Sequence, residues 1–230
     1  MDIQIHHFSK GAKKARGLAV VIDVFRAFSV ACYVLDRGAR KIVAVLEVEH
    51  ARKLKQQNPS WILIGERGGK KLSGFDYGNS PTELADASFI GKTVVQTTHA
   101  GTQNLCAARD AEHVMTGSFL NAGATIDYIR AQNPPMLSLI CSGVADEREA
   151  TEDLLCAEYM RDTLVGTPRL FQDIKDELRA AQTSQRFFDS KREDSPESDF
   201  HLCLELDKFD FAVHRVCSDS RSCVLQRNAK

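Results

Sequence analysis

The sequence lacks the features that define membrane proteins and nucleic-acid-binding proteins. No apolar run approaches the ~20 residues that a membrane-spanning helix needs. Thirty basic and 31 acidic side chains leave a net charge of −1, so we expect no attraction to nucleic acid or to an anionic membrane. The first residues show neither the basic start nor the apolar stretch of a signal peptide. These absences predict a cytoplasmic globular protein with no nucleic-acid or membrane partner.

Cysteine and histidine occur without the spacing that zinc sites and disulfide scaffolds need. The seven cysteines are odd in number and scattered, with no Cys-x-x-Cys, which favours reduced thiols in an intracellular protein. No His-x-x-x-His occurs, which argues against a zinc site. Cys141 ends an apolar run, and a buried cysteine of this kind is usually an inert core residue.

Short β-branched runs alternate with longer helical stretches. We predict strands at 18–23, 41–46, 61–65, 93–98, 113–117 and 136–141, and helices at 26–35, 48–57, from 101 onward, 119–132 and 151–164. This alternation predicts an α/β fold with a mostly parallel sheet, a mixed sheet being the alternative, and helices on both faces in three layers. No repeat or low-complexity linker divides the 230 residues, so one domain over 1–230 is expected.

The last third of the chain has a weaker pattern. Residues 168–188 read as a further helical stretch, and 189–198 as a charged, turn-rich loop. One or two extended segments are expected within 201–216, as an antiparallel edge or a return to the sheet. The residues after Cys217 are predicted to be frayed.

Charged residues, hydroxyls and glycines follow four of the predicted strands. In an open α/β sheet, ligands bind outside the carboxyl ends of the strands, so these residues are expected to share one site. They are Asp23 and Arg26; Glu66, Arg67, Gly68 and Gly69; Thr98, Gly101 and Thr102; and Ser142 and Gly143.

Each group in this set has a use in binding a charged ligand. The carboxylates of Asp23 and Glu66 supply the hard oxygen ligands that Mg²⁺ prefers. The guanidiniums of Arg26 and Arg67 fit phosphate, carboxylate or sulfonate oxygens, and the glycines and threonines expose backbone N–H groups to an anion. Two plainer interpretations stay open: Thr102 as a simple N-cap, and Asp23 with Arg26 as an ordinary ion pair. Together these residues predict a site for a small polyanion with a metal.

Several phosphate chemistries are excluded by absent motifs. The chain has neither Gly-x-x-x-x-Gly-Lys-Ser/Thr nor Gly-x-Gly-x-x-Gly, the two nucleotide-binding motifs. Gly-x-Ser-x-Gly, the hydrolase elbow, is also missing. Phe25 stands where aspartyl-phosphate phosphatases carry a second aspartate after Asp23. A phosphatase with this sequence would therefore be of an uncommon kind.

Several blocks of the sequence, in order from about residue 18 to residue 207, resemble the 2-phosphosulfolactate phosphatase family. The blocks are Ile22-Asp23-Val24-Phe25-Arg26-Ala27, Gly65-Glu66-Arg67-Gly68-Gly69, Gly74-Phe75-Asp76-Tyr77-Gly78-Asn79-Ser80-Pro81, Thr97-Thr98-x-x-Gly101-Thr102, Gly117-Ser118-Phe119-Leu120-Asn121-Ala122, Cys141-Ser142-Gly143, Glu152-Asp153, and Asp199, Cys203, Leu204 and Asp207. The second and third blocks are the most specific. The resemblance implies a cytoplasmic, Mg²⁺-dependent phosphoric monoester hydrolase that converts 2-phospho-3-sulfolactate to 3-sulfolactate and phosphate, a step toward coenzyme M.

We assign roles on the strand-end residues together with this resemblance. The expected catalytic residues are Asp23, Arg26, Glu66 and Asp153, with Asp23 and Glu66 also holding Mg²⁺; the expected substrate-binding residues are Arg67, Gly68, Gly69, Thr98, Gly101, Thr102, Ser142 and Gly143. Glu152 or Asp153 would act as base or second metal support, or would only complement a helix dipole.

The sequence departs from the family pattern at two places near the expected pocket. Phe28 follows Ala27 where Thr or Ser is usual, and Ala100 stands where the family usually has Asn. A phosphatase for a different small phospho-acid and a non-catalytic anion-binding relative are therefore the alternatives. The oligomeric state is left open, although cytoplasmic enzymes of this size are often dimers.

Overall fold

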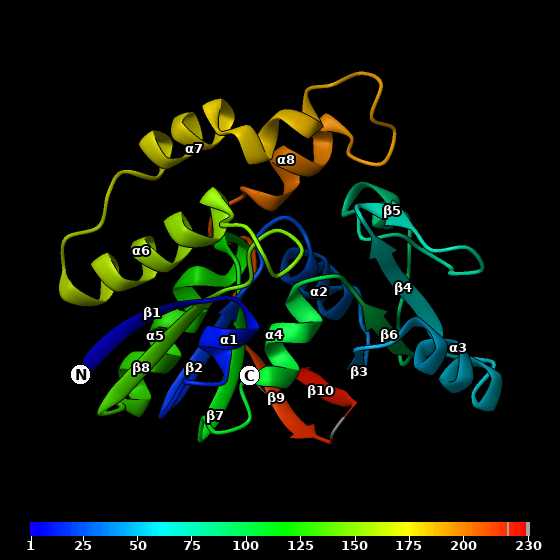
Figure 1. Ribbon diagram of the computed structural model, residues 1–230, viewed down its shortest axis with the longest axis horizontal. Helices are drawn as coiled ribbons and strands as arrows, with labels where there is room; N and C mark the ends of the chain where they lie inside the picture. The colour runs from blue at the N-terminus through cyan, green and yellow to red at the C-terminus, as the bar shows by residue number, and fades with distance from the viewer. Residues whose placement is uncertain (220, 229–230) are drawn as a thin grey trace.

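The computed structural model describes residues 1–219 and 221–228, and shows helices packed on both faces of one ten-stranded sheet (Figure 1). The strands are β1 (Asp2–His7), β2 (Leu18–Ile22), β3 (Lys41–Val45), β4 (Ile62–Arg67), β5 (Lys70–Lys71), β6 (Thr93–Thr97), β7 (His113–Gly117), β8 (Met136–Cys141), β9 (Val213–Ser218) and β10 (Ser222–Arg227). The helices are α1 (Phe8–Ala12), α2 (Ala27–Asp36), α3 (Val48–Gln57), α4 (Gly101–Ala107), α5 (Ala122–Gln132), α6 (Thr151–Val165), α7 (Phe171–Ala180) and α8 (Glu197–Cys203), with 3₁₀ turns η1 (Thr82–Leu84), η2 (Phe119–Asn121) and η3 (Gln182–Phe187). The predicted α/β class is confirmed.

The three layers follow from strands that are apolar on both faces, as β2 shows. Its side chains alternate across the sheet because successive residues of a strand point to opposite sides. Ala19 and Val21 join the core formed with α2 and α4. Leu18, Val20 and Ile22 join the core formed with α5, α6, α7 and α8. A third cluster packs α3 against β3, β4 and β6. This two-sided burial explains why the strand reads as an unbroken apolar run.

The sheet consists of two parallel groups joined by an antiparallel hairpin. Its strand order is β1-β8-β2-β7-β9-β10-β3-β6-β4-β5. The β1-β8-β2-β7 group and the β3-β6-β4 group are each parallel, whereas β9 and β10 pair antiparallel with each other and with their outer neighbours. Three antiparallel steps separate the groups, so their strands run in opposite senses along the sheet. The mixed alternative is therefore the observed one.

Sheet twist brings the carboxyl ends of the two groups back together. Adjacent strands rotate by about 20–25°, so the six steps from β2 to β4 accumulate roughly 120–150° of rotation. This rotation offsets most of the reversal that the hairpin introduces. As a result, the residues that follow β2, β4, β6 and β8 line one common cavity.

The predicted fraying after Cys217 is wrong for the described residues. β10 lies inside the sheet between β9 and β3, and its side chains Cys223 and Leu225 are fully buried. The strand was missed because its short alternating pattern carries no local sign of a position at the centre of a sheet. Residues 220 and 229–230, which belong to the same predicted frayed segment, lie outside the described residues.

Most of the remaining differences also fall in the first residues and the last third of the chain, and β5 is a short edge strand that was not predicted. The expected helical stretch 168–188 is divided into α7 and η3, and α8 occupies the start of the region expected to be extended. β9 confirms a return to the sheet, although at its centre rather than at an edge. β1 forms an edge strand that the sequence pattern did not indicate. The expectation of one domain over 1–230 stays a prediction.

The helices of the described chain were also compared with the requirements of a membrane span. Within residues 1–219 and 221–228, no helix is both long enough and apolar enough to cross a bilayer.

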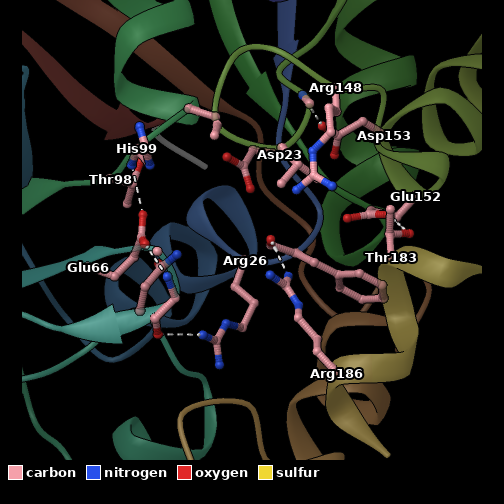
Figure 2. Close-up of a pocket in the computed structure, with 18 of the residues that line it drawn as sticks. Asp23, Arg26, Glu66, Thr98, His99, Arg148, Glu152, Asp153, Thr183 and Arg186 are labelled. Carbon is pink, nitrogen blue, oxygen red and sulfur yellow. Dashed lines mark hydrogen bonds between the residues drawn. The ribbon is translucent and has the colours of Figure 1, made fainter. Parts of the chain in front are cut away.

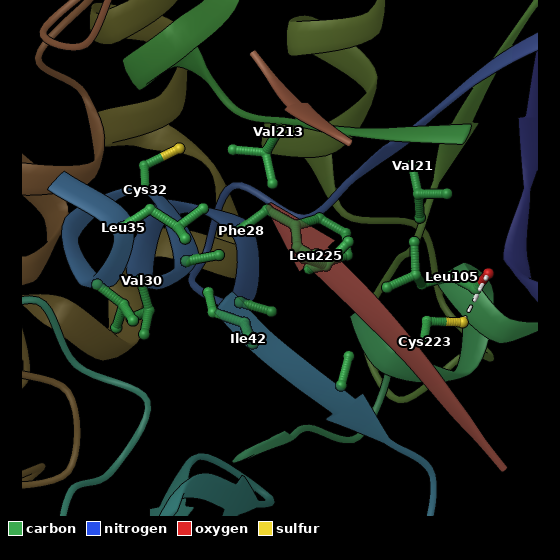
Figure 3. Close-up of a cluster of buried hydrophobic side chains, with 14 of the residues drawn as sticks. Val21, Phe28, Val30, Cys32, Leu35, Ile42, Leu105, Val213, Cys223 and Leu225 are labelled. Atoms are coloured by element: carbon green, nitrogen blue, oxygen red, sulfur yellow. Dashed lines mark hydrogen bonds between the residues drawn. The ribbon is translucent and has the colours of Figure 1, made fainter. Parts of the chain in front are cut away.

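We predict that the Leu225→Ala substitution in β10 lowers the free energy of unfolding by about 2–5 kcal/mol, because it leaves a cavity in the main core (Figure 3). The control is Leu170→Ala, since Leu170 is 73% exposed and its loss should change stability by less than about 0.5 kcal/mol. Urea denaturation of both variants gives the comparison. Equal, small effects would contradict a central position for β10.

Candidate functional site

A cavity of about 660 Å³ lies at the carboxyl ends of β2, β4, β6 and β8. Figure 2 shows carboxylates and guanidiniums from different elements facing this space. A loop at 143–149 and the η3 turn complete its wall. Eight of the predicted site residues line it, namely Asp23, Arg26, Glu66, Gly68, Gly69, Thr98, Gly143 and Asp153. Strand-end reasoning therefore brought together seven of these residues, which lie up to 120 positions apart in the chain, and the family resemblance added Asp153.

Arg67 is predicted to bind substrate, but its side chain contacts the protein instead of lining the cavity. Its guanidinium donates to the carbonyl oxygens of Glu66 at 2.6 Å and Leu46 at 3.1 Å, and to the Thr97 hydroxyl at 2.9 Å. These acceptors satisfy three of its five N–H groups. The geometry indicates that Arg67 supports the β4 end, and its role in substrate binding stays a prediction.

Three further predicted residues lie directly behind the cavity wall. Gly101 is pressed against Asp23, because a Cβ added there would stand 2.7 Å from the Asp23 Oδ2 atom. The Thr102 hydroxyl donates to the Thr98 carbonyl at 2.8 Å, so it holds the turn before α4. The Ser142 side chain is fully buried. Their contact with a ligand also stays a prediction.

Four buried carboxylates gather in this region, and Asp23 occupies the middle of the group. Its Oδ1 accepts from the Ala27 N–H at 3.0 Å. Burial raises the pKa of Asp23 to about 7, with further increases from the nearby negative charges of Glu66 and Glu152 and a partial offset from Arg186. The environment of Asp23 therefore favours its protonated form more than that of an ordinary aspartate.

The first turn of α6 supplies two more of these carboxylates. Asp153 accepts the N–H groups of Val24 and Gly143, each at 2.9 Å. Burial and the charges of Asp23 and Glu152 nevertheless raise its pKa well above the ordinary value. Burial likewise raises the pKa of Glu152, which accepts the Thr183 hydroxyl at 2.7 Å. Both side chains are buried toward the site, so complementing the dipole of α6 is not their only possible function.

The Glu66 side chain lies at the β4 end of the cavity, where its carboxylate accepts hydrogen bonds from backbone N–H groups. Its two carboxylate oxygens accept the N–H of Gly69 at 2.8 Å and the N–H of His99 at 2.7 Å. The Glu66 side chain thereby links the loop after β4 to the loop after β6. Ala100, one of the two departures from the family pattern, lines the cavity beside it, whereas Phe28 is buried in the core.

The four arginines that line the cavity fall into two classes. Arg26 forms a buried ion pair with Asp199, and Arg192 pairs with Asp194 at 3.0 Å. Neither Arg148 nor Arg186 has a carboxylate within 4.0 Å anywhere in the described chain. Two guanidiniums at the cavity thus form ion pairs within the protein and two do not, although the charges of Glu152 and Asp23 act on Arg186 from beyond 4.0 Å.

Arg186 is the more buried of the two unpaired guanidiniums. Its Nη2 donates to the Phe25 carbonyl at 3.0 Å, and its buried Nε–H has no acceptor in the described structure. Burial and the charge of Arg26 lower its pKa. A buried cation of this kind is stabilised by an anion that completes its hydrogen bonds.

Sequence reasoning missed Arg148, Arg186 and Thr183. Arg148 lies seven residues after the end of β8, farther along the chain than the residues assigned to the site at that strand end. Arg186 and Thr183 belong to η3, which reaches the cavity from more than 150 residues downstream of β2. No local pattern distinguishes their turn from an ordinary surface helix. Cys141 is buried, and burial raises its pKa, in keeping with an inert core thiol.

Metal binding by the protein alone was tested against the donor geometry. In the described part of the chain, no three His, Cys, Asp or Glu side chains are arranged so that they could hold a metal ion. The donors at the cavity are carboxylate oxygens, which suit a hard cation. Any bound Mg²⁺ would therefore need ligands from substrate or water in addition to protein carboxylates.

Comparison with known proteins gives consistent matches over this chain. A family model described as 2-phosphosulpholactate phosphatase matches residues 5–215. The chain is 41% identical over 160 residues to a "Probable 2-phosphosulfolactate phosphatase" of Caldicellulosiruptor saccharolyticus. The match covers 67% of this chain and 66% of that relative, so this chain spans slightly less than two thirds of the relative's length. A protein with the same name from Bacillus subtilis is 29% identical, and the match covers 99% of both chains. Another, from Thermotoga petrophila, is 37% identical, and the match covers 75% of this chain and 70% of the relative.

We predict that Asp199→Ala lowers the free energy of unfolding by about 3–5 kcal/mol, because it leaves the Arg26 charge buried without a partner. Asp194→Ala is the control, since its partner Arg192 is half-exposed and the pair should contribute no more than about 1 kcal/mol. Denaturant titration of the two variants measures the difference. Similar losses of unfolding free energy in both variants would mean that the buried Arg26–Asp199 pair stabilises the protein no more than the Arg192–Asp194 pair.

Proposed function

Because the chain belongs to the 2-phosphosulfolactate phosphatase family, we propose that it hydrolyses a small phosphomonoester that carries further acid groups, with 2-phospho-3-sulfolactate as the expected substrate. The observation that carries this proposal is the pair of unneutralised guanidiniums, Arg148 and Arg186, in a cavity that also holds four buried carboxylates. A phosphatase site for a polyanion needs cationic groups for the ligand and carboxylates for proton transfer.

Recognition rests on the division among the arginines. Arg26 and Arg192 are already neutralised, so their main contribution is to shape the wall. Arg148 and Arg186 keep donors for ligand oxygens, and a guanidinium binds phosphate, carboxylate or sulfonate through paired N–H groups. Phosphate, carboxylate and sulfonate on one three-carbon substrate would occupy these donors together with the backbone N–H group at Gly68.

Mg²⁺ is part of the proposal because the donor set suits it. Asp23 and Glu66 would hold the ion, since Mg²⁺ is commonly bound by one or two carboxylates together with substrate phosphate and water. Burial and the surrounding carboxylates raise the pKa of Asp23 to about 7, which shows that negative charge is unfavourable there without a cation. When bound, the ion would neutralise phosphoryl charge and lower the pKa of a water molecule.

The carboxylates of α6 are suited to the proton transfers of ester hydrolysis. Water oxygen forms a bond to phosphorus, the bond from phosphorus to the ester oxygen breaks, and the leaving oxygen takes up a proton. Asp153 or Glu152 would accept the proton from the attacking water, as both have raised pKa values that favour proton uptake. Two backbone N–H groups fix the orientation of Asp153, and Thr183 fixes that of Glu152.

Two wider parts of the proposal depend on the substrate. If 2-phospho-3-sulfolactate is the substrate, the reaction would be a step toward coenzyme M and would take place in the cytoplasm. A phosphatase for another small phospho-acid is the second candidate, favoured by Ala100, which lines the cavity where the family usually has Asn.

Phosphate release from 2-phospho-3-sulfolactate by the purified protein, with Mg²⁺ and with EDTA, tests the proposal. We expect release with Mg²⁺ and its loss in EDTA. Release from other phospho-acids alone would support the second candidate. Release that persists in EDTA would remove Mg²⁺ from the proposal, and the absence of release from every ester would contradict a phosphatase function.

We predict that Arg186→Ala lowers kcat/KM by about 100-fold, because removing a buried donor to a developing charge costs roughly that much. Arg192→Ala is the matched control at the same cavity, and it should cost less than about tenfold because Asp194 already neutralises that guanidinium. Steady-state kinetics on the active substrate measure both. A loss in Arg192→Ala as large as in Arg186→Ala would contradict the division into paired and free arginines.

We predict that the stability of the protein in EDTA falls as pH rises from about 4 to about 7, in part through Asp23. The pKa of Asp23 in the folded protein, about 7, exceeds the ordinary value of 3.8. The contribution of Asp23 to the free energy of unfolding is therefore fully present below the unfolded pKa, and it is lost as pH rises through the folded pKa. Asp23→Asn should make this fall shallower, as measured by denaturant unfolding across the pH range.

The same variant tests the metal ligand without any measurement of activity. At about pH 8, Mg²⁺ should raise the Tm of the wild-type protein and have a smaller effect on Asp23→Asn, because the variant lacks the charge that the ion would neutralise. An equal rise in both proteins would exclude Asp23 as a ligand.

A further inference from the structure

Two buried cysteine side chains from distant parts of the sequence meet in the main core. Cys106 lies near the end of α4 and Cys223 near the start of β10, and their sulfur atoms are 3.2 Å apart. The two residues are 3% and 0% exposed. Figure 3 shows Cys223 beside Leu105 of α4, whose carbonyl oxygen it contacts at 3.9 Å. The pair belongs to the core on the α2 and α4 side of the sheet.

This arrangement distinguishes the two thiols from the other cysteines. Cys32, Cys141, Cys156 and Cys203 are also buried, but in the described chain none of them forms a hydrogen bond with another sulfur. Burial raises the pKa of Cys32 to about 12, which makes it an unreactive thiol. Cys217 is exposed and lies on the neighbouring strand β9.

A positive charge stands next to the pair. Arg215 of β9 donates to the Leu105 carbonyl at 3.0 Å, which holds its guanidinium beside the two sulfurs. The hydrogen bond shared by the two sulfurs and the Arg215 charge lower the pKa of Cys223, while the same hydrogen bond and burial raise the pKa of Cys106. Cys223 is therefore the better nucleophile, and Cys106 is placed to attack it after oxidation.

We propose that Cys106 and Cys223 form an oxidative modification site, which hydrogen peroxide converts to an intramolecular disulfide. The Cys223 sulfur attacks one peroxide oxygen, the O–O bond breaks, and a sulfenic acid and water result. The Cys106 sulfur then attacks the sulfenic sulfur, and the S–O bond breaks with loss of a second water. The two thiols together give up two electrons and two protons, and the peroxide accepts both.

The geometry allows this reaction with little movement. A disulfide bond is about 2.0 Å long, so the sulfurs must approach by roughly 1 Å, a change within reach of side-chain rotation. The ladder between β9 and β10 shifts register between Val224 and Leu225, directly after Cys223. A register shift of this kind bends and twists the strand locally.

The bond would join α4 to the central hairpin. α4 follows the turn that holds Thr98 and Gly101 against the cavity, and β10 connects the two parallel groups of the sheet. The two cysteines are 117 positions apart, and a cross-link that closes a loop of this length restricts the unfolded chain. Oxidation should therefore raise the Tm of the wild-type protein. This inference does not depend on the proposed function.

The test treats the full-length protein with a small excess of hydrogen peroxide and counts thiols after unfolding. We expect two of the seven thiols to disappear, with a mass decrease of about 2 Da and a linked peptide pair that contains Cys106 and Cys223. Dithiothreitol should restore all the thiols and the original Tm. The linked peptide identifies the site in the wild-type protein, so the result does not depend on a variant that folds.

Single substitutions provide the controls. Cys106→Ser and Cys223→Ser should each abolish the 2 Da decrease and the rise in Tm, whereas Cys32→Ser and Cys217→Ser should retain both. Seven unreacted thiols in folded, peroxide-treated protein would overturn the proposal. So would oxidation confined to Cys217, or oxygen addition to Cys223 without a link to Cys106.

Discussion

The buried ion pair between Arg26 and Asp199 is the interaction on which the arrangement of the site depends. Asp199 also accepts the Ser80 hydroxyl at 2.9 Å and the Thr82 N–H at 2.9 Å, so one carboxylate joins the end of β2, the turn at η1 and helix α8. A buried charge is tolerated only when its partners are complete. Phe200 of α8 packs against Phe187 at the end of η3, and Thr183 and Arg186 of the same turn line the cavity wall (Figure 2).

Charge is distributed in the cavity so that some groups are satisfied by the protein and others are left for a ligand. Arg26 and Arg192 have carboxylate partners, whereas Arg148 and Arg186 do not. Burial raises the pKa values of Asp23, Glu152 and Asp153 above their ordinary values, and neighbouring negative charges add to the rise for Asp23 and Asp153. A substrate with several negative groups, bound together with a cation, would balance both sets at once.

Much of the fold was predictable because its signals are local. The predicted segments 48–57, 113–117 and 136–141 agree with α3, β7 and β8 at both ends. A strand buried on both faces gives an apolar run, and an amphipathic helix gives a 3.6-residue period. The position of β10 was not predictable, because centrality in a sheet depends on the strands that pair with it. The same holds for the reversal between the two parallel groups and for the twist that offsets it.

The sequence by itself determined the α/β class, the succession of the main strands along the chain and seven cavity-lining residues at strand ends, because residues that follow parallel strands collect at a common edge. Only the tertiary structure decided which charged groups face a ligand. Arg67, adjacent to Glu66 in the sequence, is engaged by carbonyl oxygens, while Arg186 enters the cavity from a segment with no local signal. The physical reason is that spacing and periodicity report neighbours along the chain, whereas neutralisation of a charge depends on partners that are distant in sequence.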